Sequence, residues 1–129
     1  MHVLLVCTSP ELAADVEELA GREDFEQAMF LSGRSMGIVL DLYDMAVTHA
    51  EKCDYVHAAR IVQRSRPGMG LQEAVDVRLA LFSEYEEEMG RLVDQVAVTH
   101  PEVAQAMREV QGGSVAWLGK MRGRRYLER

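Results

Sequence analysis

The chain has 129 residues, of which 48% are hydrophobic and 27% are charged, and its formal net charge is −7. This length accommodates one folded domain, and this balance excludes disordered, collagen-like and mucin-like chains. The longest uninterrupted apolar run is Val3–Cys7. Because a membrane-spanning helix needs roughly 18 apolar residues, we expect no membrane partner.

The charge is distributed unevenly along the chain. Residues 120–129 contain five basic residues and one glutamate, a local charge of +4, so residues 1–119 carry −11. Because phosphate binding requires a basic surface, we expect the acidic body to bind no nucleic acid. We predict a single helical domain over 1–119, followed by a solvated basic C-terminal tail over 120–129.

The cysteine content indicates the compartment. Cys7 and Cys53 are the two cysteines, and they form no CxxC motif. Two cysteines are too few for a disulfide framework, and we therefore predict a reducing, cytoplasmic location.

The first part of the chain predicts two short helices. Ser9 is a suitable N-cap, with Pro10 as the first residue of a helix that Gly21 ends. Asp24, followed three residues later by glutamine, forms a capping-box pattern for a second helix. The Ser-Gly pair at 32–33 is expected to stop that helix.

The middle of the chain contains the strongest helical signal. Residues 36–65 are compatible with one continuous helix or with two helices separated near 52–54, and the sequence leaves both readings open. A Pro- and Gly-containing loop follows at 66–70. Apolar residues then repeat every seven positions over 71–98, which predicts one helix about 40 Å long.

The last part of the chain completes a bundle. A capping box at 99–102 predicts a helix that ends at the Gly-Gly pair 112–113, with a short helix after it. We therefore predict a mainly α fold, a bundle of about five helices around the long central helix 71–98. The alternative is a small α/β fold with a strand at residues 2–6, since periodicity cannot distinguish strand from helix in so short a run.

Three residues have the spacing of a metal site. His49, Cys53 and His57 follow one another at intervals of four, so they share a face if one helix passes through them. Imidazole and thiolate are the ligands that zinc and other transition metals prefer. This pattern predicts an alternative function as a metal- or thiol-dependent sensor or enzyme. The favoured interpretation requires no cofactor, because catalytic motifs are absent from the sequence.

A second thiol hypothesis concerns Cys7. The opening Val3–Thr8 resembles the strand-then-cysteine opening of low-molecular-weight tyrosine phosphatases. That family requires an arginine six positions after the cysteine, whereas position 13 is alanine. Without that side chain the phosphate loop lacks its main cation.

The methionine content favours a non-enzymatic interaction protein, such as an adaptor, an assembly factor or a small helical chaperone. The chain has eight methionines, and methionine adapts to irregular partner surfaces. We predict that a protein partner binds an apolar surface containing Met36, Tyr43, Phe82 and Met89. Because the 71–98 helix has a wider apolar band than a small monomer covers, we also predict a homodimer.

Overall fold

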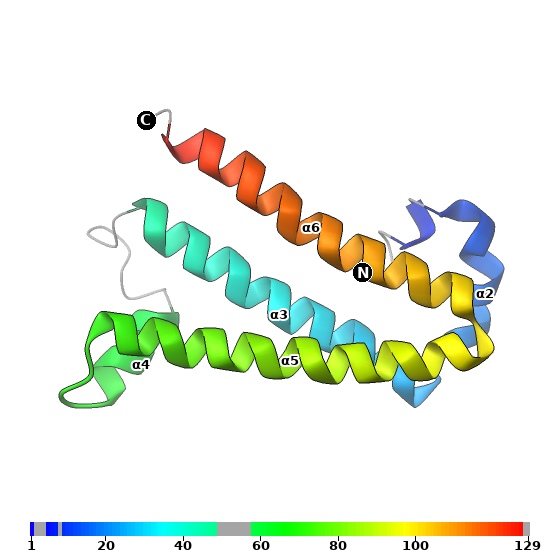
Figure 1. Ribbon diagram of the computed structural model, residues 1–129, viewed down its shortest axis with the longest axis horizontal. Helices are drawn as coiled ribbons and strands as arrows, with labels where there is room; N and C mark the ends of the chain where they lie inside the picture. Colours follow the sequence, from blue (N-terminus) through cyan, green and yellow to red (C-terminus); the bar gives the residue numbers. More distant parts are fainter. Residues whose placement is uncertain (2–4, 8, 49–57, 128–129) are drawn as a thin grey trace.

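The computed structural model describes residues 1, 5–7, 9–48 and 58–127, and within them it contains five α-helices, a short 3-10 helix and no strand. The model is 89% helical, which confirms the predicted helical bundle with a long central helix (Figure 1). In chain order the elements are η1 (Pro10–Leu12), α2 (Ala13–Leu19), α3 (Glu23–Thr48), α4 (Ala58–Ser65), α5 (Leu71–Thr99) and α6 (Pro101–Leu127).

The N-terminal apolar run forms a helical turn, so the alternative strand at 2–6 is wrong for its described part. Residues 5–7 have helical backbone. The amide of Leu5 donates to the carbonyl of Met1 at 2.8 Å, and the amide of Ser9 donates to the carbonyl of Leu5 at 2.9 Å. The Leu5 side chain is 1% exposed within the core. The hydrophobicity of this N-terminal run therefore reflects the burial of a helical turn, not of a strand.

The turn between α2 and α3 requires a glycine, as predicted. Gly21 has a φ of +88°, a conformation in which a Cβ would clash with the backbone. The Gly21 amide donates to the Glu26 carboxylate at 3.1 Å. The helix begins at Glu23, so Asp24 lies in its first turn, where its carboxylate accepts from the Phe25 amide at 2.8 Å. Arg22 then donates to Asp24 and to Thr99 at the end of α5, which connects the start of α3 to the far end of the central helix.

Two predicted helix ends are wrong. α3 continues through the Ser-Gly pair 32–33, and α6 continues through Gly112-Gly113. Each interior glycine weakens a helix by about 1 kcal/mol. At the Ser-Gly pair, tertiary packing on both sides, by Leu31 and Ser35, offsets that cost. α6 also crosses the predicted boundary at 119–120 and ends at Leu127, so the basic segment continues a helix.

The open question over residues 36–65 is answered by one hydrogen bond. The amide of Ala58, at the start of α4, donates to the Asp41 carboxylate in α3 at 3.0 Å. In a single straight helix these residues would lie about 25 Å apart. The chain therefore turns back between them, and α3 and α4 are separate helices.

The main hydrophobic core lies at the α2 end of the molecule. It contains Leu5, the apolar face of η1 and α2, and the first third of α3. The C-terminal third of α5, from Met89 to Val96, and the first two turns of α6 complete it. Ile38, Ala59 and Ala74 are buried separately, in α3, α4 and α5. No helix among the described residues is long and apolar enough to cross a membrane.

We expect opposite effects from two glycine-to-alanine substitutions. A Cβ at Gly90 in α5 would meet nothing within 4 Å, so Gly90→Ala should raise the free energy of unfolding by about 0.5–1 kcal/mol. Gly21→Ala, at positive φ, should lower it by about 1 kcal/mol. Urea denaturation followed by circular dichroism measures both. Equal effects would contradict this account of the two glycines.

Candidate interaction surface

A buried polar layer joins the three long helices. Gln111 of α6 is 6% exposed, and its amide oxygen accepts from the Ser32 hydroxyl of α3 at 2.5 Å. Its amide nitrogen donates to the Ser35 hydroxyl at 2.9 Å and to the Glu86 carboxylate of α5 at 2.7 Å. Because an ionised carboxylate only accepts, Glu86 fixes the orientation of the amide. We call these four residues the Gln111 layer.

The Gln111 layer marks the end of the close three-helix packing. Gln111 is the last buried residue of α6 among those whose side chains are described, and residues 112–116 are exposed or half-buried. Figure 1 shows the C-terminal part of α6 lying farther from α5 than its start does. Apolar side chains beyond the layer are therefore only partly covered.

A groove of about 410 Å³ lies beside the layer, between α5 and α6. Apolar side chains form its floor, and two charged side chains and two glycines line its sides. Arg108 is paired with Asp94, and Glu86 with Gln111. Its lining consists of Phe82, Glu86, Met89, Gly90 and Val93 from α5, and Arg108, Gln111, Gly112 and Val115 from α6. We call it the α5–α6 groove.

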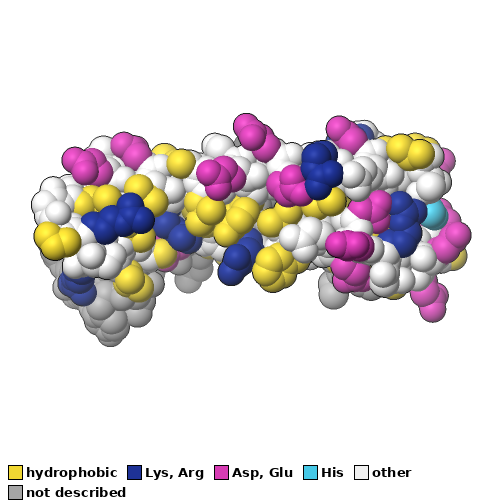
Figure 2. All heavy atoms as spheres, turned by 90° about the horizontal axis from the view of Figure 1, so that it is seen from below, with side chains coloured by type: hydrophobic (Ala, Val, Ile, Leu, Met, Phe, Trp, Pro, Cys, Tyr) yellow, Lys and Arg dark blue, Asp and Glu magenta, His cyan; other side chains and the backbone are white. Residues whose placement is uncertain are grey.

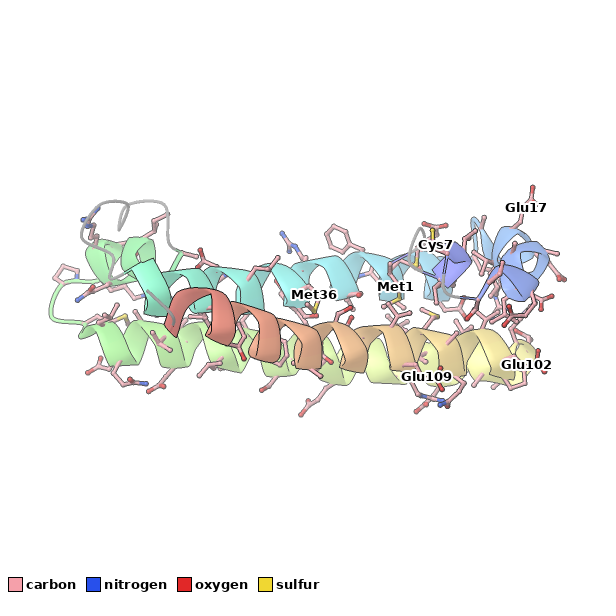
Figure 3. All side chains as sticks on the ribbon, turned by 90° about the horizontal axis from the view of Figure 1, so that it is seen from above. Met1, Cys7, Glu17, Met36, Glu102 and Glu109 are labelled. Carbon is pink, nitrogen blue, oxygen red and sulfur yellow. The ribbon has the colours of Figure 1, made fainter. Side chains whose placement is uncertain are left out.

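The four predicted partner-binding residues divide between this groove and α3. Phe82 and Met89 line the groove, although Met89 is only 4% exposed and belongs to the core. Met36 and Tyr43 are half-buried on α3, and Figure 3 shows Met36 on the part of α3 that α6 overlies. The sequence pattern located the apolar floor but not Gln111 or Arg108. No sequence pattern marks Gln111 or Arg108, because only the packing of α6 on α5 brings them to the groove.

The opposite side of the molecule presents a second apolar surface. Phe30 of α3 is 55% exposed, and the Arg34 guanidinium carbon lies 5.0 Å from the centroid of its ring. The same guanidinium lies 5.9 Å from the Tyr85 ring and donates to its hydroxyl at 3.3 Å. Figure 2, which views the molecule from below, shows a band of apolar side chains along the long axis, interrupted by arginines. We call this side of the α3–α5 pair, which faces away from α6, the seam face.

The predicted metal ligands His49, Cys53 and His57 lie outside the described residues. They fall between the last residue of α3, Thr48, and the first residue of α4, Ala58. The prediction that a metal binds these residues is untested.

A different group of metal-binding side chains does come together. In the described part of the chain, ligand atoms of Asp15, Glu18 and His100 lie within 4.8 Å of one another. His100 Nε2 lies 3.5 Å from a Glu18 carboxylate oxygen, and Nδ1 lies 2.8 Å from the Thr99 hydroxyl. The donor types suit a divalent cation. However, Arg22 lines the same hollow and α6 starts there, so both neighbouring charges oppose a cation.

These carboxylates have a structural role that needs no metal. They lie beside the N-terminal turn of α6, whose first amides have no partner within the helix and carry a partial positive charge. His100 is the residue between α5 and α6, and its contact with Glu18 connects α2 to that corner. We therefore interpret these side chains as contacts that hold α2 against the corner between α5 and α6.

The structure lacks the strand on which the hypothesis of a phosphate-binding thiol at Cys7 depends, within the described residues. Cys7 is exposed, and Figure 3 shows it on the N-terminal segment beside α2. The resemblance predicts a strand before Cys7, whereas residues 5–7 form a helical turn. That geometry does not resemble a strand-then-loop phosphate site.

Comparison with known proteins assigns no family to the chain. No protein-family model matches the sequence, and no curated protein matches it significantly.

We expect the Gln111 layer to behave as a unit. Gln111→Leu leaves the Ser32 hydroxyl without its acceptor and removes a donor from Ser35, so it should cost about 2 kcal/mol. Replacing both serines by alanine in the same chain should recover most of that loss, because neither buried hydroxyl is then left without its partner. Chemical denaturation of the single, double and triple variants measures the coupling. Simple additivity would refute it.

The Arg22–Asp24 pair should give an acid-dependent contribution to stability. The hydrogen bond from Arg22 holds the pKa of Asp24 below its ordinary value of 3.8. A lowered folded-state pKa stabilises the protein above the unfolded pKa, and this contribution is lost as pH falls through the folded value. Asp24→Asn should therefore cost about 1 kcal/mol at neutral pH, and this cost should shrink as pH falls through the folded-state pKa. Thermal unfolding across this range tests it, and a pH-independent difference would contradict it.

Proposed function

We propose that this chain is a non-enzymatic protein-interaction module, an adaptor, assembly factor or small helical chaperone, which binds an amphipathic helix of a partner protein. The observation that carries the proposal is the α5–α6 groove. Its floor contains Phe82, Met89 and Val93, and it opens where α6 ceases to be buried against the rest of the bundle.

The dimensions of the groove suit a helical ligand. From Phe82 to Val93 it follows α5 for eleven residues, about 17 Å, which corresponds to three turns of a bound helix. Amphipathic helices bind such grooves through apolar anchors spaced three or four residues apart. Met89 supports this use because a methionine side chain adjusts its shape to different anchors.

The two glycines in the lining leave room for the backbone of such a ligand. A Cβ at Gly90 or at Gly112 would meet nothing within 4 Å, so both face open space. Because glycine has no side chain, a bound helix can approach α5 and α6 closely there. The charged groups at the sides are already paired within the chain, and we expect apolar contacts to dominate the affinity.

The surrounding features support the same function. The acidic body disfavours nucleic acid as a partner, and the cysteine content favours the cytoplasm. The alternative, a zinc-dependent sensor or enzyme using His49, Cys53 and His57, is untested because those residues lie outside the described part of the chain.

Site-specific photo-crosslinking in the source cells tests the proposal. A photoreactive phenylalanine analogue at Gly112 should capture one or a few discrete proteins. The same analogue at Val98, which is 83% exposed and outside the groove, should not capture them. Gly90→Leu should abolish capture at position 112, because Gly90 lines the groove and a Cβ there meets nothing within 4 Å, so the new side chain can extend into the groove.

Two outcomes would contradict the proposal. The first is an absence of discrete adducts at position 112. The second is an identical set of adducts at positions 98 and 112, which would indicate non-specific collisions. Circular dichroism of Gly90→Leu should show unchanged helicity, so that lost capture reflects a filled groove.

A further inference from the structure

We infer that the seam face binds a second copy of this chain in an antiparallel, two-fold symmetric dimer centred on Phe30, Arg34 and Tyr85. This surface belongs to α3 and α5 and faces away from α6, so the inference is independent of the proposed partner groove.

The aromatic cluster has the composition and order of an interface centre. The Phe30 ring is 55% exposed, yet Arg34 lies over it and is held by Tyr85. Tyr85 in turn packs against the core. Arginine and aromatic side chains dominate binding energies at protein interfaces, and little further ordering is needed when they are already fixed.

The apolar surface extends from this centre along α5 toward α4. Val77 and Leu81 precede Tyr85 by two turns and one turn of α5, and both are half-buried. Figure 2 shows the resulting apolar band. An apolar band of this kind is uncommon on a small monomer and indicates an interaction surface.

The distribution of charge indicates that the occupant is another copy in the reverse direction. In Figure 2, arginine side chains lie within the band toward the α4 end, and carboxylates surround the α2 end. Glu23 starts α3 at the acidic end, and Arg66 follows α4 at the basic end, and both are exposed. A two-fold axis across the face brings each acidic end beside the partner's basic end.

Sedimentation equilibrium of the full chain tests the inference. At low ionic strength and tens of micromolar protein, we expect a monomer–dimer equilibrium in which dimers predominate. Phe30→Asp should raise the dissociation constant at least about 30-fold. Val98→Asp, an equally polar change at an exposed position elsewhere on α5, should leave the dissociation constant within twofold. Unchanged circular dichroism spectra verify that both variants fold.

A charge-reversal pair tests the antiparallel arrangement. Glu23→Lys and Arg66→Glu should each weaken the dimer, and the double variant should recover the original dissociation constant. A monomeric parent chain, an unaffected Phe30→Asp variant or a double variant weaker than both single variants would overturn the inference. Gly90→Leu should dimerise normally, so a failure of partner binding in the groove is distinguished from a failure of self-association.

Discussion

Gln111 is a buried amide that hydrogen-bonds to side chains from both of the other long helices, and the rest of the architecture depends on it. Its partners are Ser32 and Ser35 on α3 and Glu86 on α5. If α6 shifted along the bundle, the Gln111 amide would lose these hydrogen bonds while still buried, and burying an unpaired amide costs free energy. Only one register of α6 against α3 and α5 is therefore favourable.

The same layer separates two regions with different properties. On the α2 side, the core is closed on all sides by η1, α2, α3, α5 and α6. On the other side, α6 no longer supplies buried side chains among the described residues, and α3, α4 and α5 bury a small separate group. The closed half gives the molecule its stability. The open half contains most of the incompletely covered apolar surface that our functional proposal uses.

The two proposed surfaces differ in physical character, and this difference follows from their positions. The α5–α6 groove has an apolar floor with paired charges beside it, which suits ligands that contribute apolar anchors. The seam face combines an arginine–aromatic cluster with opposite charges at its two ends, which suits a self-complementary partner. Because they lie on different sides of α5, both can be occupied at once, and the central helix is common to the two.

The sequence by itself determined the helical class, the central helix and the turns at Gly21 and 66–70, because helical periodicity and glycine conformation are local properties. It also identified Phe82 and Met89 as part of an apolar stripe. It misjudged the Ser-Gly pair, where tertiary contacts outweigh local propensity, and Gly112-Gly113, through which α6 continues although both glycines are exposed. Only the tertiary structure decided that α3 and α4 are separate, that Gln111 is buried and that Phe30 remains exposed. Each of these depends on contacts between residues far apart in the chain, which a local pattern does not encode.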